Sequence, residues 1–195
     1  GACSLAPHIV LHESGLAFEG VLASTKTHQL ADGSDYYAVN PLGYVPFLVL
    51  ADGRTLREGQ VISQYIADQV PASGLAPAAG TWERYKLQEW LSFISSELHK
   101  GFSPLFNPAT PDDYKPLVKD RLLQRLTWLD GELAGKDYLM GSTFTVADAY
   151  LFTVTNWAAF VKLDIGALAN LAAVRARIAA RPAVQAAMKA EGLIK

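Results

Sequence analysis

A stretch rich in proline, glycine and alanine, residues 71–80, divides the chain into two parts of different character. Before it, short apolar runs of strand length alternate with helical patterns, whereas after it only helical patterns remain. With 195 residues the chain is long enough for one large or two small domains. The sequence therefore predicts an α/β domain over residues 1–70, a linker over 71–80 and an all-helical domain over 81–195.

The first part has the pattern of a small unit in which helices and strands alternate. Gly15 stands where a first helix should end, and Asp52-Gly53 is a tight-turn signal between two short runs, the first of which reads as a buried strand. The last helix has an apolar face made of Val61, Ile62, Tyr65 and Ile66. The expected elements are a helix over Pro7–Ser14, a strand over Phe18–Ala23, a weak helical segment over Ser34–Val39, strands over Phe47–Leu50 and Arg54–Leu56, and a helix over Glu58–Gln69.

The second part reads as a set of helices around one central helix. The predicted helices are Trp82–Lys100, Asp112–Leu133, Ala147–Val161, Leu168–Arg181 and Pro182–Glu191. Phe102-Ser103-Pro104 is expected to break the first of them, and one apolar stripe of the second contains Leu122, Leu126, Leu129 and Leu133. Thr145 and Asp148 have the spacing of a capping box, with aspartate in place of the usual glutamate. The helix that follows is apolar nearly all round and is expected to be central.

Cys3 is the only cysteine and comes just before the first predicted helix. Free backbone N–H groups and the helix dipole stabilise an anion at a helix N-terminus, which favours a thiol with a lowered pKa, and the thiolate is the nucleophile. The alternative is that a lone cysteine is a small buried hydrophobic side chain. The position before a helix, next to Ser4, favours a functional thiol.

Two dipeptides further along the first part are candidates for binding a ligand. Val45-Pro46 stands immediately before a predicted strand and, with Cys3 upstream at a helix start, resembles the thioredoxin-like arrangement, in which the residue before a cis-proline offers its backbone to a bound peptide. Glu58-Gly59 opens a helix, where the N–H of Gly59 can bind an anion and the carboxylate of Glu58 can pair with an ammonium group. Taken alone, Glu58 is better interpreted as an ordinary first-turn acid that complements the helix dipole.

The composition excludes several classes of function. The net charge of −2 gives no electrostatic case for binding nucleic acid or an anionic membrane. No apolar run approaches the roughly 20 residues that span a bilayer, and no signal peptide is visible. A single cysteine cannot form an internal disulfide, which fits a reducing compartment and predicts a cytoplasmic protein.

A metal or nucleotide site is not expected either. His8 and His12 are four residues apart on one helix face, a spacing found in metal sites, but no third ligand is marked nearby. An ordinary helix surface is the favoured interpretation of this pair. No glycine-rich phosphate loop is present.

Together these features resemble a cytosolic glutathione transferase, and they do so over essentially the whole chain. The segments Gly1-Ala2-Cys3-Ser4-Leu5-Ala6-Pro7-His8 and Glu97-Leu98-His99-Lys100-Gly101 resemble the bacterial beta class specifically. Ser142-Thr143-Phe144-Thr145-Val146-Ala147-Asp148-Ala149-Tyr150 resembles the helix-capping signature of that fold. The resemblance implies a thioredoxin-like N-terminal domain, a helical C-terminal domain and a site in the cleft between them.

The resemblance also assigns the residues that bind glutathione, the expected co-substrate. Cys3 matches the cysteine that contacts the glutathione sulfur and can form a mixed disulfide with it, and His99 matches a second catalytic residue near that sulfur. The other matched positions are Ser4, His28, Val45, Pro46, Glu58, Gly59, Ser92, Ser96, Glu97, Leu98 and Lys100.

Several of these positions have specific implied roles. Val45 matches the residue whose backbone pairs with the cysteinyl part of glutathione, and Glu58 with Gly59 matches the pair that holds the γ-glutamyl end. His28 stands where the class often has a lysine for the glycyl carboxylate. A protonated or hydrogen-bonding His99 would stabilise the thiolate.

The implied activity is transfer of glutathione to electrophilic, aromatic or halogenated compounds by a homodimer, without a metal. Cys3 would also allow glutathione-dependent thiol–disulfide exchange or reductive dehalogenation. The apolar pocket for the electrophile is expected from Phe102, Phe106, Tyr114 and Trp157. The alternative is a non-catalytic transferase-like module for ligand binding or protein contact. The fold of the family also has a strand before the cysteine, so we expect residues upstream of Gly1 in the complete protein.

Overall fold

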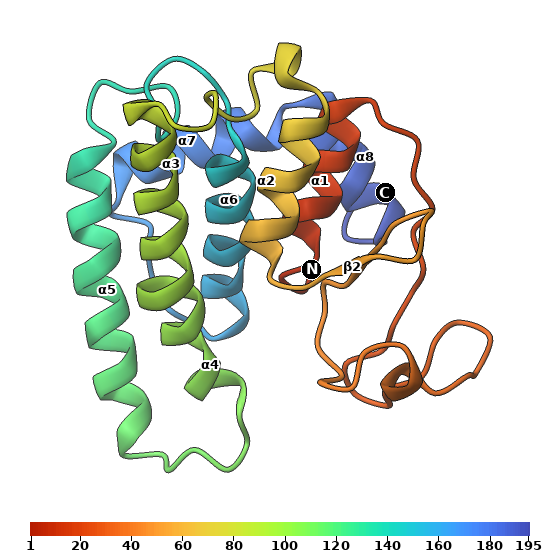
Figure 1. Ribbon diagram of the computed structural model, residues 1–195. Coiled ribbons are helices and arrows are strands. Elements are labelled where there is room, and N and C mark those ends of the chain that lie inside the picture. The colour runs from red at the N-terminus through yellow and green to blue at the C-terminus, as the bar shows by residue number, and fades with distance from the viewer.

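The computed structural model describes residues 1–195 as eight α-helices and one two-stranded sheet (Figure 1). A π-helix, η3, joins α3 to α4, and two short 3₁₀-helices, η1 and η2, lie in the first part of the chain. The bounds are α1 Leu5–Ser14, η1 Tyr36–Ala38, β1 Leu48–Val49, β2 Thr55–Leu56, α2 Gly59–Gln69, η2 Pro71–Ser73, α3 Trp82–Phe93, η3 Ile94–His99, α4 Lys100–Phe106, α5 Tyr114–Glu132, α6 Val146–Phe160, α7 Ala169–Ala179 and α8 Pro182–Ala190. None of the helices has both the length and the apolar character that crossing a membrane would require.

Helix α6 is the centre of the molecule, as predicted, and lies between α3 and α2 in Figure 1. Twelve of its fifteen residues are buried, because the helix is covered by α1, α2, α3, α7 and η3. A capping box of Thr145 and Asp148 starts it, also as predicted. The hydroxyls of Thr153 and Thr155 bond back to carbonyls of their own helix, so these buried polar groups are satisfied.

Helices α3, η3 and α4 form one continuous helical segment that packs beside α5 (Figure 1). The leucine stripe of α5 is buried as predicted, and Leu126 and Leu129 are fully enclosed. The predicted break at Phe102-Ser103-Pro104 is wrong, because the segment remains helical to Phe106. Phe102 is completely buried and anchors this stretch in the core. Pro104 lies within α4, which ends two residues later.

The first part of the chain has less sheet than the sequence predicted. Phe18–Ala23 forms no strand: it has no neighbouring strand to pair with, and only Ala23 makes an isolated bridge, to Leu30. The hairpin is confirmed as β1 and β2, which pair antiparallel, but its first strand is not buried, since Val49 is 55% exposed. The helical segment at Ser34–Val39 shrinks to η1. In α2, Ile62 and Ile66 are buried, whereas Val61 faces solvent.

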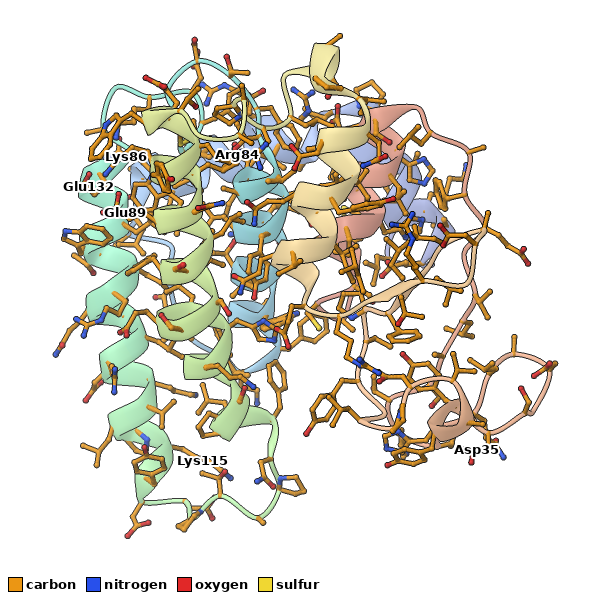
Figure 2. The ribbon with its side chains drawn as sticks, in the orientation of Figure 1. Asp35, Arg84, Lys86, Glu89, Lys115 and Glu132 are labelled. Carbon is orange, nitrogen blue, oxygen red and sulfur yellow. The ribbon has the colours of Figure 1, made fainter.

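The two parts share one continuous hydrophobic core. Helix α1 packs against α2, α6 and α8, so the N-terminal helices lie against the C-terminal ones. The segment between α2 and α3 is fixed at both ends: Arg84 is buried, pairs with Asp68 of α2 and donates from Nε to the carbonyl of Pro77 at 2.7 Å. Figure 2 labels Arg84 near the top of α3, on the side toward α2. The division into domains at 71–80 stays a prediction.

Candidate active site

Cys3 lies in the turn just before α1, where the sequence predicted it, but its thiol is not activated by the helix. Its Sγ donates a hydrogen bond to the backbone carbonyl of Val45 at 3.1 Å. Burial raises the pKa of the Cys3 thiol, although the backbone amides of Cys3 and Ser4 and the nearby charge of Lys100 oppose the rise. The predicted lowering of this pKa is therefore wrong, because desolvation outweighs the helix N-terminus.

The Val45–Pro46 peptide bond is cis, and the loop before it is held in place by buried polar side chains. The carbonyl of Tyr44 accepts from the hydroxyl of Tyr36 at 2.7 Å and from Nδ2 of Asn40 at 2.8 Å. Oδ1 of the buried Asn40 also accepts from Arg57. Asn40 and Tyr36 were not among the residues predicted for the site. Both satisfy the backbone of the loop that presents Val45 to Cys3.

Glu58 lies at the N-cap of α2 and not in its first turn, which corrects the reading as an ordinary helix acid. Its backbone is in the left-handed region, with φ 66° and ψ 108°. A non-glycine residue there is strained by about 1–3 kcal/mol, and such residues cluster at binding sites. The side chain makes no capping bond, so its carboxylate is free to bind. Next to it, Gly59 contacts Pro46: an added Cβ would lie 3.4 Å from Cγ of the proline.

His99 is the last residue of the π-helix η3, a geometry that is frequent at functional sites. Its Nδ1 lies 2.6 Å from the hydroxyl of Tyr150 in α6, and its ring packs against Trp157 with 4.9 Å between centroids. Burial, with a smaller contribution from the charge of Lys100, lowers the pKa of His99 to about 4. The imidazole is therefore neutral at physiological pH, so of the two forms expected for His99, protonated or hydrogen-bonding, the hydrogen-bonding one fits the structure. Tyr150 was not among the residues predicted for the site.

The remaining residues of the second part have different surroundings. Ser92 and Ser96 are exposed on the surface of the helical segment, where the Ser96 hydroxyl bonds to the carbonyl of Ser92. Glu97 accepts from Nε of Arg125 at 2.7 Å, and this pair and Arg121 lower the pKa of its carboxyl group. Leu98 is completely buried in the core, so its side chain cannot contact a ligand.

Of the four residues predicted for an electrophile pocket, Phe102, Phe106 and Trp157 pack on one another, and Tyr114 lines a separate hollow. Phe102, fully buried, and Phe106, half exposed, both pack on the Trp157 indole with their rings at right angles to it. The indole N–H of Trp157 donates to the carbonyl of Gly1 at 2.9 Å. A hollow of about 460 Å³ lies between α4 and α5, and Tyr114 is the one residue of the predicted set that lines it. The other lining residues are Ser103, Pro104, Asn107, Ala109, Thr110 and Pro111. Lys115 marks this end of α5 in Figure 2.

His28 and Ser4 complete the predicted set. His28 has a left-handed backbone with φ 53°, stacks on Tyr37 at 4.5 Å and packs over Gly43, and its Nδ1 is enclosed without a partner. Ser4 is the N-cap of α1 but makes no capping bond, so its hydroxyl is free. No group of three or more His, Cys, Asp or Glu side chains is arranged to hold a metal ion.

We define the Cys3 site as Cys3, Val45, Pro46, Glu58, Gly59 and His99. Its parts come from the turn before α1, the cis-proline loop, the start of α2 and the π-helix. The charges of Glu58 and Lys100 both act on the Cys3 thiol, and those of Cys3 and Glu58 act on Tyr150. The structure therefore gathers at one place residues that lie almost one hundred positions apart in the sequence.

A thiol in the turn before a helix, hydrogen-bonded to the residue that precedes a cis-proline, in a chain whose second part is helical, is the arrangement expected of a glutathione transferase. Comparison with known protein families gives the same result: the glutathione S-transferase N-terminal domain matches residues 2–69 and the C-terminal domain matches residues 93–182. The chain thus belongs to the glutathione S-transferase family, and the predicted thioredoxin-like and helical fold is confirmed.

Its relatives place it in the bacterial beta class. It is 50% identical to glutathione S-transferase GstA of Escherichia coli O157:H7 over 193 residues, which cover 99% of this chain and 96% of that protein. The bacterial beta-class glutathione S-transferase of Sphingomonas chungbukensis is 49% identical, with a TM-score of 0.95 over 99% of this chain and 96% of that one. A sphingomonad glutathione S-transferase solved in complex with glutathione is 50% identical, with a TM-score of 0.94 over the same shares. The alternative of a non-catalytic module is not favoured.

Proposed function

We propose that this enzyme binds glutathione at the Cys3 site and transfers it to small electrophiles, aromatic or halogenated, that bind beside Phe106, Tyr114 and Trp157. The observation that carries the proposal is the Cys3 thiol lying 3.1 Å from the carbonyl of Val45, next to the cis bond to Pro46. A bound cysteinyl backbone paired with Val45 would have its sulfur close to Cys3. A relative of 50% identity has been solved with glutathione bound.

Each end of glutathione has a matching group nearby. The carboxylate of Glu58, which makes no capping bond, fits the ammonium of the γ-glutamyl end, and the N–H groups at the start of α2, including that of Gly59, fit its carboxylate. His28 packs over Gly43 of the cis-proline loop with its Nδ1 enclosed, so a contact with the glycyl carboxylate would be made by the other ring nitrogen, Nε2. Ser4, Ser92, Ser96, Glu97, Leu98 and Lys100 remain predicted contacts, with Leu98 limited to its backbone because its side chain is buried.

The electrophile subsite is proposed at the aromatic surface that follows the π-helix. Phe106 and Tyr114 are about half exposed, and an apolar aromatic compound would cover part of their rings. Trp157, supported by Phe102, would form the floor between this surface and His99. Aromatic walls of this kind select shape weakly, so we expect several related electrophiles to be accepted.

Cys3 adds a second proposed reaction, the reduction of glutathione mixed disulfides. The Cys3 thiolate attacks the glutathione sulfur of R–S–S–G, which forms a Cys3–glutathione disulfide and releases RSH after protonation. A second glutathione thiolate then attacks this disulfide, regenerates the Cys3 thiol and leaves oxidised glutathione. The raised pKa of the free thiol means that Cys3 reacts slowly until it is deprotonated at the site.

The substitution Cys3→Ser tests these roles, because an alcohol can donate a hydrogen bond to Val45 but is a far poorer nucleophile. We expect disulfide reduction and covalent glutathionylation of the protein to vanish in Cys3→Ser, whereas conjugation of glutathione to a chromogenic aryl halide persists at a reduced rate. Retention of disulfide reduction would overturn the covalent role. Failure of the wild-type protein to conjugate any of a panel of aryl and alkyl halides would overturn the transferase proposal.

We also propose that the enzyme acts in the cytoplasm and that it is a twofold homodimer. The dimer would cover, by an isologous contact, apolar side chains that one chain leaves exposed. Trp82, Tyr85 and Val61 are exposed on α3 and α2. Light scattering at micromolar concentration should give twice the chain mass of 21.1 kDa, and a mass of one chain would contradict the dimer.

A further inference from the structure

Tyr150 brings the only phenol hydroxyl that reaches His99, and it does so from inside the core. Tyr150 is 5% exposed and comes from α6, the most completely buried helix of the molecule. The hydroxyl lies 2.6 Å from Nδ1 of His99, and the two rings meet edge to face at 5.8 Å. Trp157 packs on the same imidazole at 4.9 Å, so the ring is held from two directions.

The two ring nitrogens of His99 are not equivalent. Nδ1 is paired with Tyr150, whereas Nε2 has no hydrogen-bond partner within the chain and is not enclosed. A neutral imidazole carries one hydrogen, and the hydrogen bond made by one nitrogen decides which nitrogen bears it. The direction of the Tyr150–His99 bond therefore determines what Nε2 offers to a ligand.

The surroundings favour Tyr150 as the donor. Burial raises the pKa of its phenol, with the charges of Cys3 and Glu58 adding to the effect and the Ser95 hydroxyl opposing it, so the group keeps its proton. A buried O–H without an acceptor is unfavourable by about 1–3 kcal/mol. Nδ1 is the acceptor in hydrogen-bond distance, and accepting from Tyr150 leaves the imidazole hydrogen on Nε2.

We propose that Tyr150 is a positioning residue that fixes His99 in the tautomer carrying its hydrogen on Nε2, so that an uncharged N–H donor faces bound glutathione. This inference rests on the proposed function for its catalytic consequence, because the N–H would stabilise the glutathione thiolate by a hydrogen bond. No proton is transferred by His99 in this arrangement. The positive charge of Lys100, the next residue, adds to the stabilisation of the anion.

The tautomer can be measured without any turnover. ¹⁵N NMR of histidine-labelled protein distinguishes a nitrogen that bears hydrogen from one that does not, and the chain has four histidines, so His99→Gln assigns the signals. In the wild type we expect Nε2 of His99 to bear the hydrogen between pH 6 and 8. In Tyr150→Phe we expect a mixture of tautomers. A hydrogen on Nδ1 in the wild type, or an unchanged spectrum in Tyr150→Phe, would overturn the proposal.

The kinetic consequence has a separate readout. In Tyr150→Phe we expect kcat for aryl-halide conjugation to fall about tenfold, KM for glutathione to change less than twofold, and the pH profile of kcat to move to higher pH because the bound thiol is less acidic. In a His99→Gln background, Tyr150→Phe should have no further effect. A fall in kcat of equal size in both backgrounds, with an unmoved pH profile, would indicate a structural role and contradict the proposal.

Tyr138→Phe is the matched control. Tyr138 is also a buried tyrosine with a hydrogen-bonded hydroxyl, which accepts from Arg181 far from the Cys3 site. We expect this variant to keep the wild-type pH profile, so a shift in Tyr138→Phe as large as that in Tyr150→Phe would overturn the assignment to His99. If the wild type shows no turnover at all, the proposed function fails, while the NMR experiment still decides the tautomer.

Discussion

The carboxyl group of Asp148 offers a test in which two opposing effects on one buried charge can be compared. Its Oδ1 accepts from the N–H of Leu139 at 2.8 Å, and its Oδ2 accepts from the N–H and the hydroxyl of Thr145 at 2.8 and 3.0 Å. These three donors favour the ionised form, whereas complete burial disfavours it. Burial is the larger effect and raises the pKa of Asp148 from 3.8 to about 6.

The sign of the pH dependence follows from this difference. Between the pKa of the unfolded chain and that of the folded one, the folded state binds more protons, so its stability falls as pH rises. Because the pKa of Asp148 is raised from 3.8 to about 6, the free energy of unfolding is lower above pH 7 than below pH 3.8 by about 3 kcal/mol. The Asp148→Asn side chain cannot titrate. Its NH₂ group takes the place of one carboxylate oxygen and faces a hydrogen-bond donor, so that donor loses its acceptor, which lowers the free energy of unfolding by about 1–3 kcal/mol.

Urea unfolding of the wild type and of Asp148→Asn, at one protein concentration and at a series of pH values from 4 to 7, measures the effect. We expect the wild type to be the more stable protein at pH 4, and its advantage to shrink by about 2–3 kcal/mol by pH 7. Other groups titrate equally in both proteins and cancel in the difference. An advantage that grows with pH would show that the three hydrogen bonds outweigh burial, and would refute the reasoning. Asp120→Asn, the same change on the exposed surface of α5, is the control and should give a flat difference.

Two further pairs of variants test the packing of the helical part by urea unfolding. Gly101→Ala should lower stability by about 1–3 kcal/mol, because the added Cβ would lie 2.8 Å from Cδ2 of Leu122. Gly131→Ala, whose Cβ would meet nothing within 4 Å, should raise stability by up to about 1 kcal/mol. A stabilised Gly101→Ala would contradict the close approach of α4 and α5. Leu126→Ala should lower stability by about 2–5 kcal/mol. Leu117 is 63% exposed on the same helix, so Leu117→Ala should lower stability by less than about 0.5 kcal/mol. Equal effects of the two substitutions would contradict the buried stripe.

The second part of the chain was predictable because its signals are local. The stripe from Leu122 to Leu133 repeats at helical spacing, and burial of one face follows directly from such a repeat. The capping box of Thr145 and Asp148 is read from four consecutive residues and is present as predicted. The sequence could not show that Asp148 also accepts from Leu139, since that contact depends on how the preceding loop folds back.

The first part was harder to predict, because a strand depends on its neighbour. The run from Phe18 to Ala23 has strand composition, but only Ala23 finds a bridge partner in the structure, so its backbone forms no ladder. The Cys3 thiol was misjudged for a related reason. Its position before α1 was read correctly, but the burial that raises its pKa comes from the chain packed around it, including the carbonyl of Val45, 42 positions away.

His99 shows most clearly why a pattern can locate a site residue without giving its chemistry. The periodicity over Trp82–Lys100 predicted one regular helix, but residues 94–99 form the wider turn of a π-helix. In this turn Ile94 and Leu98 remain fully buried while His99, the next residue, meets Tyr150 and Trp157 of α6. Tyr150 is 51 positions away, and no local rule pairs the two. Because this contact helps to bury the imidazole and occupies Nδ1, His99 is held as a neutral, hydrogen-bonding group, and the chemistry available to the site follows from α6 as much as from His99 itself.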